Sequence, residues 1–300
     1  MNPEFSLVAY LSERKAQVDG ALDGYLPRGQ NGPPVIFEAI RYSLLAGGKR
    51  IRPILCMAAA EAVGGEAEAV LPAACALEMI HTYSLIHDDL PAMDNDDYRR
   101  GRATSHKVFG EDIAILAGDA LLTEAFRLLT DRGGMPGMPP DRLLDVAREI
   151  AEAAGHRGMV GGQVRDIRAE GEAVGLETLY AIHRQKTGAL LRVSIRTGAI
   201  LAGAGEEALA ALSDYGGTIG LAFQIADDIL NVEGDPLLLG KGTGSDAARG
   251  KVTFPALMGI EASRARAAEL VMDAVSSLAS FDHRAAPLRA IARYILERRS

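Results

Sequence analysis

The spacing of apolar residues constrains the fold of this chain more than any other feature of its sequence. Apolar residues recur every three or four positions over most of the chain, and no convincing run alternates apolar with polar residues. The first pattern is typical of helices that bury one face, whereas the second is expected of strands. The segments with helical spacing are Val35–Ala46, Pro53–Val63, Ala67–His87, Asp112–Thr130, Asp141–Ala154, Leu176–Ala202, Glu206–Val232, Pro255–Leu278 and Pro287–Arg299. The sequence therefore predicts an all-α protein.

Composition and helix breaks indicate how these helices are organised. Ala, Leu and Glu are abundant, Trp is absent and aromatic residues make up 5% of the chain, which favours helices over strands. Gly and Pro interrupt the helical spacing at 28–34, 47–53, 133–140 and 234–250, and none of these breaks is an obvious interdomain linker. The length of 300 residues allows two domains or one large domain. We expect a single domain, 1–300, in which about ten helices pack as a large bundle.

Charge, cysteine content and hydropathy narrow the class of protein. The 32 basic and 40 acidic residues give a net charge of −8, so we expect no general nucleic-acid binding. Cys56 and Cys75 cannot form a disulfide framework and fit a reducing compartment. No apolar run approaches the ~18 residues of a membrane-spanning helix, and the N-terminus lacks the basic start and apolar stretch of a signal peptide. The expectation is a cytoplasmic protein with no membrane span.

The first candidate site is a cluster of carboxylates at the end of an apolar helix. Asp88 and Asp89 follow the apolar segment 76–86, and Asp94 lies five residues further on. Carboxylates at a helix C-terminus oppose the helix dipole and cost stability, which suggests a functional role. Oxygen-rich clusters of this kind suit Mg²⁺, which binds carboxylates together with phosphate oxygens. The alternative is a solvated acidic turn.

A second acidic pair, Asp227 and Asp228, lies inside the apolar helical segment 218–232. Adjacent like charges in such a segment are unfavourable unless a cation neutralises them. Gln224 precedes the pair and Asn231 follows it at helical spacing, so both share its helix face. The alternative is a polar stripe that faces solvent. Together, the two clusters predict two helices that point carboxylates across a cavity, where metal ions would bridge them to a polyanion.

Basic residues around both clusters point to a diphosphate as that polyanion. Arg99, Arg100 and Arg102 follow the first cluster, and Lys241 and Lys251 follow the second. Arg and Lys are the usual partners of phosphate. The side chains of Arg99 and Arg100 point in different directions because the residues are adjacent, which suits two separate anions. An isolated basic pair is more often a solvated surface, and the acidic cluster beside this one favours a site.

A second anion site is predicted at the glycine turn 47–53, which runs into the start of a helix. Exposed backbone N–H groups favour anions there, and Lys49 and Arg52 add positive charge close to Gly48. His81 stands seven residues before the first aspartate pair and therefore shares its helix face. The alternatives are an ordinary loop with exposed bases and a histidine that belongs to the core.

Three further segments carry polar groups of interest. Lys186 and Thr187 interrupt a long helical stretch, where the lysine would hold phosphate and the hydroxyl would face a developing cation. The loop 239–251 has the glycines of a mobile lid. Gln163 and Asp166 stand three residues apart, as a polar patch that would line the cavity.

These motifs resemble the two aspartate-rich motifs of the trans-isoprenyl diphosphate synthases, and bacterial farnesyl diphosphate synthases in particular. The resemblance runs from about residue 34 to the C-terminus. It is carried by Gly47–Arg50, Ser84–Pro91 with Asp94, Arg99–Gly101, His183–Gly188, Gly220–Leu230 and Lys251–Pro255. It implies an all-α bundle of the isoprenoid synthase type around a central cavity, and a homodimer. It also implies about three Mg²⁺ ions per active site, with isopentenyl diphosphate and allylic diphosphates as substrates.

The resemblance assigns roles residue by residue. Metal binding falls to Asp88, Asp89, Asp94, Asp227 and Asp228. The allylic diphosphate or its carbocation would contact Arg99, Lys186, Thr187, Gln224 and Lys241, with Lys251 as a further substrate contact. Isopentenyl diphosphate would be held by Gly48, Lys49, Arg52, His81 and Arg100. The chain departs from the family at Asn231, where a third aspartate is usual, and this removes one negative charge beside the third metal ion.

The implied reaction is a head-to-tail prenyl transfer. Metal ions and basic residues stabilise the diphosphate as it leaves the allylic substrate, and isopentenyl diphosphate attacks the resulting cation. Tyr83, five residues before Asp88, would form the floor of the cavity, so farnesyl diphosphate is the expected product. A geranylgeranyl diphosphate synthase is the alternative. A terpene cyclase, a head-to-head condensing enzyme and a non-catalytic modulatory subunit fit less well, because both aspartate motifs and the second set of bases are present.

Overall fold

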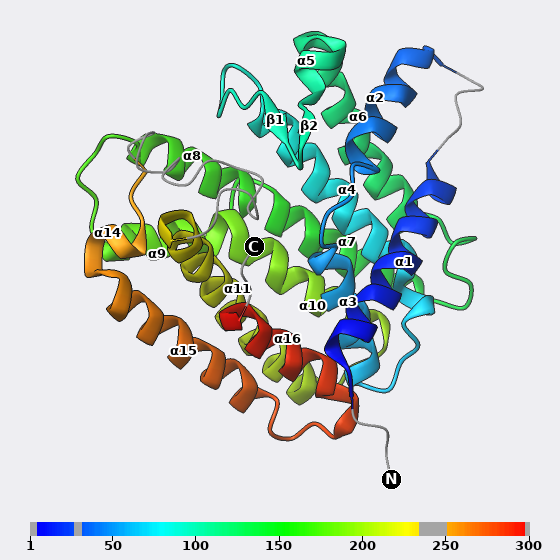
Figure 1. Ribbon diagram of the computed structural model, residues 1–300. Helices are drawn as coiled ribbons and strands as arrows, with labels where there is room; N and C mark the ends of the chain where they lie inside the picture. The colour runs from blue at the N-terminus through cyan, green and yellow to red at the C-terminus, as the bar shows by residue number, and fades with distance from the viewer. Residues whose placement is uncertain (1–4, 27–31, 234–250, 298–300) are drawn as a thin grey trace.

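The computed structural model describes residues 5–26, 32–233 and 251–297, most of which are helical (Figure 1). The α-helices are α1 (Leu7–Tyr25), α2 (Pro34–Leu44), α3 (Ile51–Ala62), α4 (Leu71–Asp88), α5 (Ser105–Phe109), α6 (Glu111–Thr130), α7 (Pro140–Ala154), α8 (Met159–Ala169), α9 (Leu176–His183), α10 (Ala189–Leu201), α11 (Glu206–Glu233), α14 (Phe254–Met258), α15 (Ile260–Ser277) and α16 (Ala286–Glu297). The described residues also form two 3₁₀ turns, η1 (Glu68–Val70) and η3 (His283–Ala285), and a π-helical turn, η2 (Arg184–Gly188). The all-α fold is confirmed.

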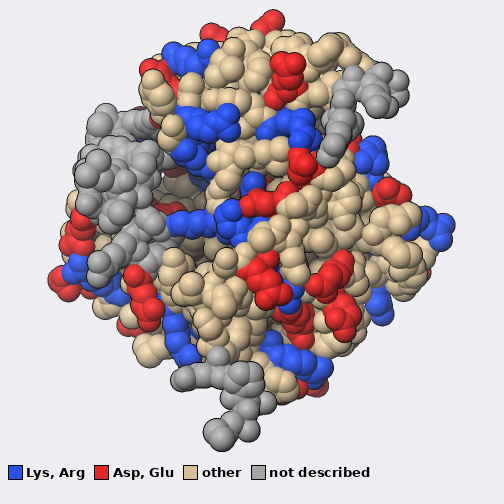
Figure 2. All heavy atoms as spheres, turned by 45° about the vertical axis from the view of Figure 1, so that its right-hand side comes forward, with Lys and Arg blue, Asp and Glu red and all other residues tan. Residues whose placement is uncertain are grey.

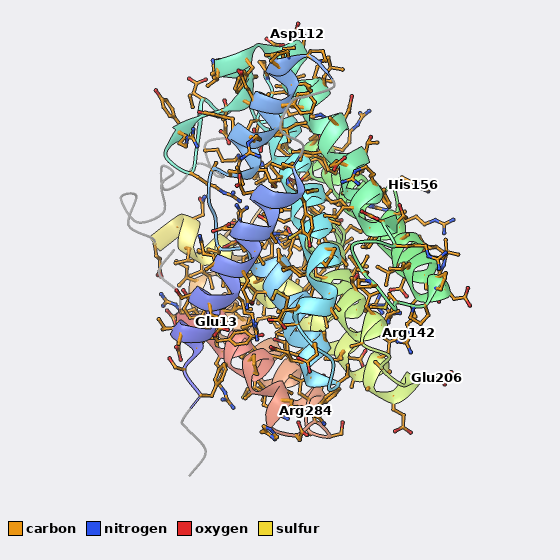
Figure 3. The ribbon with its side chains drawn as sticks, turned by 90° about the vertical axis from the view of Figure 1, so that its right-hand side faces the viewer. Glu13, Asp112, Arg142, His156, Glu206 and Arg284 are labelled. Carbon is orange, nitrogen blue, oxygen red and sulfur yellow. The ribbon has the colours of Figure 1, made fainter. Side chains whose placement is uncertain are left out.

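Three helices, α4, α10 and α11, form the centre of the bundle (Figure 1). α4 packs against α3 and α6, α10 packs against α3 and α11, and α11 packs against α15. The buried apolar side chains form one cluster around α4 and α6 and another around α11, α15 and α16. Polar side chains such as Glu13, Asp112, Arg142 and Glu206 lie at the periphery in Figure 3. The apolar faces predicted from the sequence therefore meet in the interior.

The central position of α4 explains its unusual composition. Within the described part of the chain, Glu68–Asp88 is the one helical region long and apolar enough to cross a membrane by length and composition alone. The expectation that no apolar run approaches this length was therefore wrong. Of the qualifying window, 72% is buried inside the bundle. A helix that other helices enclose is apolar on all its faces, so a core helix passes the same test.

Two of the predicted helices are each divided in the structure. The stretch Leu176–Ala202 contains the π-helical turn η2, which separates α9 from α10 and carries two of the predicted site residues. Turns of this kind within α-helices are frequent at functional sites. The stretch Pro255–Leu278 is divided at Gly259, whose φ of +82° is a left-handed conformation that glycine adopts readily.

Among the described residues, three helices and a short hairpin were not predicted from the sequence. α1 buries only Val18 and Leu22. Few of its positions therefore need to be apolar, and its helical apolar spacing is weak. α5 has five residues, too few to show a period, and glycines within α8 look like a break. The described strands β1 (Tyr98–Arg99) and β2 (Arg102–Ala103) have two residues each and pair antiparallel. The predicted lid is mostly outside the described residues, which resume at Lys251.

Candidate active site

A cavity of about 460 Å³ opens between the start of α3, α4, the hairpin, η2 and α11. On the face shown in Figure 2, Lys and Arg side chains gather beside a hollow. Leu85, Leu191 and Phe223 give the cavity an apolar wall. The predicted site residues that line it are Gly48, Lys49, Arg52, His81, Arg99, Arg100, Thr187, Gln224 and Asp227. Segments far apart in the sequence thus contribute to one cavity.

Arg52 and Arg100 form a basic side of this cavity. Burial lowers the pKa of Arg52 to about 10, and its Nε has no hydrogen-bond partner among the described residues. Arg100 donates to the carbonyl oxygen of Gly47. Its guanidinium carbon would lie 2.6 Å from a Cβ at Gly48, whose φ is +121°. Glycine at this position therefore permits both the turn and the approach of Arg100.

Arg50 also lines the cavity and is held there by contacts with three other residues. It precedes α3 in a left-handed conformation, with φ 53°, that residues other than glycine seldom adopt. Its side chain is 1% exposed, and its Nη1 lies 2.7 Å from Glu78 Oε1. Its Nε lies 2.8 Å from Asp19 Oδ1, and Nη2 donates to the carbonyl oxygen of Leu44 at 2.7 Å. The sequence analysis missed Arg50 and Glu78, although Glu78 lies one turn before His81 on the same helix face.

His81 faces the cavity as a neutral imidazole. Burial lowers the pKa of His81 well below its ordinary value, and the positive charges of Arg52 and Arg100 lower it further. A neutral imidazole has one hydrogen-bond donor and one acceptor. His81 would therefore bind an anion by a hydrogen bond, while the arginines supply the charge.

The carboxylates of the first aspartate motif have different surroundings. Asp89 is buried, and its two oxygens accept hydrogen bonds from the Nε of Arg99 at 2.6 and 2.9 Å. Burial raises the pKa of Asp88 to about 6; Asp94 adds to this rise, and Lys186 opposes it. A carboxylate whose ionised form is penalised in this way would be stabilised by a bound cation.

Two lysines contact the same carboxylate, that of Asp166. Lys186 Nζ lies 2.6 Å from Asp166 Oδ2. Lys251 Nζ lies 3.4 Å from Asp94 Oδ1 and 3.7 Å from the same Asp166 oxygen. Asp166 on α8 is thus shared by two cations, a role that the sequence analysis did not assign to it. A polyanion in the site would compete with these carboxylates for both lysines.

The two aspartates of the second motif point to different sides of α11. Asp227 lines the cavity, whereas Asp228 is buried and accepts hydrogen bonds from other elements. One turn earlier, Gln224 accepts a hydrogen bond from the hydroxyl of Thr187 at 2.8 Å. Asn231 lies one turn later on the same helix.

The carboxylates do not form a compact metal cage. Within the described ranges, no group of three or more His, Cys, Asp or Glu side chains is placed to hold a metal ion. Mg²⁺ usually binds one or two carboxylates and completes its coordination with water and substrate phosphates. Asp88, Asp94 and Asp227 are each partly exposed and fit that mode. The donor set therefore suits Mg²⁺ together with a polyanion, better than Mg²⁺ alone.

Several of the predicted site residues are not among those that line this cavity. The described ones are Asp88, Asp89, Asp94, Lys186, Asp228, Lys251 and Tyr83. Lys241 is outside the described residues. Tyr83 is buried, with its ring in edge contact with His87 at 5.7 Å between centroids, and it is not among the cavity-lining residues. Two residues correspond to about 200° around an α-helix, so Tyr83 faces away from the side that His81 presents to the cavity.

Relatives with known names match the chain over nearly its whole length. The family model described as Polyprenyl synthetase matches residues 33–285. A dimethylallyltranstransferase of Fischerella ambigua (strain UTEX 1903) is 49% identical over 295 residues, which cover 98% of this chain and 84% of the relative. A geranylgeranyl diphosphate synthase of Cyanophora paradoxa is 49% identical over 299 residues, which cover 99% and 98%.

Solved structures agree with these matches. The structure of an FPP/GFPP synthase from Zymomonas mobilis superposes with a TM-score of 0.85 at 38% identity, covering 97% of this chain and 98% of that one. A geranylgeranyl pyrophosphate synthetase from Pyrococcus horikoshii gives a TM-score of 0.88 at 32% identity, with the same coverage. On its sequence and its fold, the chain belongs to the polyprenyl synthetase family of trans-isoprenyl diphosphate synthases.

Proposed function

We propose that this prenyltransferase condenses isopentenyl diphosphate head to tail with allylic diphosphates, in the presence of Mg²⁺, and yields mainly geranylgeranyl diphosphate. The observation that carries the proposal is a single cavity with a basic side, which suits one diphosphate, and a side with a carboxylate, which suits a second diphosphate bound through Mg²⁺. One side has Arg52, Arg100 and neutral His81, and the other has Asp227 near Thr187 and Gln224. Two diphosphates can therefore enter one site, whereas a terpene cyclase needs only one.

The residues of the chain would divide the reaction between them. Asp88, Asp94 and Asp227 would hold Mg²⁺, which when bound stabilises the charge of the departing diphosphate. Lys186 and Lys251 would leave their carboxylate partners for phosphate oxygens. These interactions favour cleavage of the bond between C1 of the allylic substrate and the diphosphate oxygen, because the negative charge develops on that oxygen.

The allylic cation must then be shielded from water until the double bond of isopentenyl diphosphate attacks it. Leu85, Leu191 and Phe223 would shield it from water. The hydroxyl of Thr187 donates a hydrogen bond to Gln224. The lone pairs of the hydroxyl oxygen can therefore face the cation. Isopentenyl diphosphate, held by the arginine side, attacks C1, and a proton then passes to the departed diphosphate. No nucleophilic side chain of the protein is required.

The length of the product is proposed from the relatives and from the position of Tyr83. Two of the compared proteins are named as geranylgeranyl diphosphate synthases. Tyr83 packs on His87 and is not among the residues that line the cavity, which supports a product that grows without meeting its ring. Farnesyl diphosphate is the second candidate, because the buried ring of Tyr83 stands five residues before Asp88, where it would block a chain that grows along α4.

Product analysis of the purified protein tests this proposal. With Mg²⁺, dimethylallyl diphosphate and excess isopentenyl diphosphate, we expect a product of four isoprene units from both the unaltered chain and Tyr83→Ala. A three-unit product that lengthens to four units in Tyr83→Ala would instead assign farnesyl diphosphate and make Tyr83 the floor. Absence of turnover from the pure chain would reject the proposed function in favour of a modulatory subunit.

We also propose that the chain acts as a homodimer, as its family resemblance implies. Sedimentation equilibrium of the purified protein should then give twice the mass of one chain, 31.7 kDa. A single-chain mass that persists throughout turnover would contradict the dimer and leave the chemistry intact.

A further inference from the structure

We infer that Asp228 is a positioning residue and not a metal ligand: it fastens the segment that carries Lys251 to α11 and sets the orientation of Gln224. The inference rests on the proposed function, because Lys251 and Gln224 matter there as groups that face the diphosphate and the cation. It changes the role that the family resemblance implied for the second aspartate of this motif. It also accounts for a buried charge that the proposed reaction does not otherwise use.

The hydrogen bonds of Asp228 come from three different places in the fold. Its Oδ2 accepts from the backbone N–H of Phe254 at 3.0 Å and lies 3.3 Å from Nε2 of His183. Its Oδ1 accepts from Nε2 of Gln224 at 3.3 Å. The residue is 4% exposed. Three of the roughly four acceptor positions of a carboxylate are thus directed at protein donors, in a place that water and metal ions do not readily reach.

Asp227, the neighbour of Asp228 on the same helix, has the position expected of a carboxylate that binds a metal ion. It lines the cavity and is partly exposed, whereas Asp228 is absent from the cavity wall. Adjacent residues of an α-helix point about 100° apart. The helix therefore presents Asp227 to the substrate and turns Asp228 towards α9 and α14.

The bond to Phe254 anchors the start of α14. The ring of Phe254 is completely buried, stacks on His183 at 5.4 Å between centroids and meets Tyr180 edge-on at 5.0 Å. Lys251 stands only three residues earlier, and its Nζ reaches Asp94 at 3.4 Å. Because three residues span at most about 11 Å, fixing the backbone at Phe254 confines Lys251 to the neighbourhood of the first aspartate motif.

The bond to Gln224 decides which way its amide faces. A carboxylate has no hydrogen to donate, so Gln224 must present its NH₂ group to Asp228. The amide oxygen then faces Thr187, whose hydroxyl donates to it at 2.8 Å. If Asp228 became an amide, Gln224 would be free to turn over, and the hydroxyl hydrogen of Thr187 would point elsewhere. The charge of Asp228 thus sets the polarity of a group that lines the cavity.

Hydrogen exchange in the metal-free protein tests the anchor without any turnover. We expect Asp228→Ala to speed exchange of the Phe254 amide by about tenfold or more, because the acceptor is lost. Asp227→Ala is the matched control, and it should leave this amide unchanged. If Asp228→Ala fails to fold, Asp228→Asn keeps an acceptor for Phe254 and should retain slow exchange. Fast exchange of this amide in the unaltered protein would overturn the inference, as would unchanged exchange in a folded Asp228→Ala.

Binding of inorganic diphosphate separates positioning from metal ligation. Titration calorimetry at several Mg²⁺ concentrations should show that Asp227→Asn raises the Mg²⁺ requirement by at least about tenfold. Asp228→Asn should leave that requirement within about threefold while lowering kcat about 10- to 100-fold. An equal rise in the Mg²⁺ requirement for both variants would make Asp228 a metal ligand and overturn the inference.

A double-mutant cycle tests whether Asp228 acts through Lys251. If Asp228 acts through Lys251, the loss of kcat caused by Asp228→Asn should be smaller on a Lys251→Gln background than in the unaltered chain. Full additivity would exclude action through Lys251. Failure of the unaltered enzyme to turn over would reject the proposed function, while the exchange measurement would still decide the role of Asp228.

Discussion

At the scale of single residues, Asp88 carries a cost in stability that follows from its burial. Burial raises its pKa to about 6 from an ordinary value of 3.8, so the folded metal-free protein binds a proton there more tightly than the unfolded chain does. The contribution of Asp88 to the free energy of unfolding is therefore lost as the pH rises between these two values. A cation bound beside Asp88 would remove this cost.

We predict that Asp88→Asn stabilises the metal-free protein at neutral pH. The gain in the free energy of unfolding should reach at most about 3 kcal/mol at pH 7.5 and shrink as the pH approaches 4. Urea unfolding at a series of pH values measures it. Asp97→Asn is the control, because the pKa of exposed Asp97 is lowered by a hydrogen bond from Lys107, so this variant should gain nothing. A lower stability of Asp88→Asn at pH 7.5 would contradict the prediction.

At the scale of elements, the close approach of α10 to α3 depends on one glycine. A Cβ at Gly198 would lie 1.8 Å from the carbonyl oxygen of Cys56, a backbone atom that cannot move aside without shifting α3. We predict that Gly198→Ala lowers the free energy of unfolding by about 3 kcal/mol or more. Thermal unfolding provides the measurement.

Gly217→Ala is the control for Gly198→Ala. Gly217 lies within α11, and the nearest atom to a Cβ there is 4.0 Å away, on the side chain of Arg192. Alanine should be neutral at this position or stabilise the helix by up to about 1 kcal/mol. Equal effects of the two substitutions would mean that the contact between α10 and α3 is looser than the structure shows.

The buried pair Arg50–Glu78 joins elements in another way. Both side chains are at most 2% exposed. We predict that Arg50→Met costs about 3–5 kcal/mol of stability, because Glu78 would keep a buried charge without this partner. Denaturant unfolding tests it, and adding Glu78→Gln should recover part of the loss. Arg264→Met removes two exposed ion pairs, one with Glu233 on α11 and one with Glu261 on α15, and should cost less than about 1 kcal/mol. A loss of stability below about 1 kcal/mol in Arg50→Met would mean that the pair contributes little to the stability of the fold.

At the scale of the whole molecule, the proposed reaction needs carboxylates from α4 and α11, two helices that are far apart in the sequence. We predict that Asp88→Asn and Asp227→Asn each lower turnover by at least about 100-fold, since each removes charge from a different part of the metal site. Far-ultraviolet circular dichroism should show unchanged helix content. Steady-state kinetics at saturating substrates measure the effect, and near-normal turnover in either variant would contradict the two-sided metal site.

Part of the candidate site was predictable because the necessary information is local. Asp88 and Asp89 stand at the end of an apolar helix, and Asp227 and Asp228 interrupt another. Residue type and helical spacing are enough to notice such departures from an apolar pattern. The turn at Gly48 was likewise recognisable, because its glycines and bases are consecutive. The all-α fold followed from the same local periodicity.

The rest of the site depends on contacts between residues far apart in the chain. Arg50 reaches Glu78 across 28 positions, His183 reaches Asp228 across 45, and Lys251 reaches Asp94 across 157. Periodicity says which face of a helix is apolar, but not which helix covers it. The two adjacent aspartates of α11 look equivalent in the sequence and face different surroundings in the fold.

The sequence by itself determined most of the helices, the two acidic motifs and the basic turn, because each depends on residues that are neighbours along the chain. Only the tertiary structure decided that Asp166 is shared by two lysines, that Asp228 is turned into the core and that Tyr83 faces away from the cavity. Those outcomes depend on how each helix is rotated about its own axis. That rotation is set by packing against all its neighbours at once, which no local segment encodes.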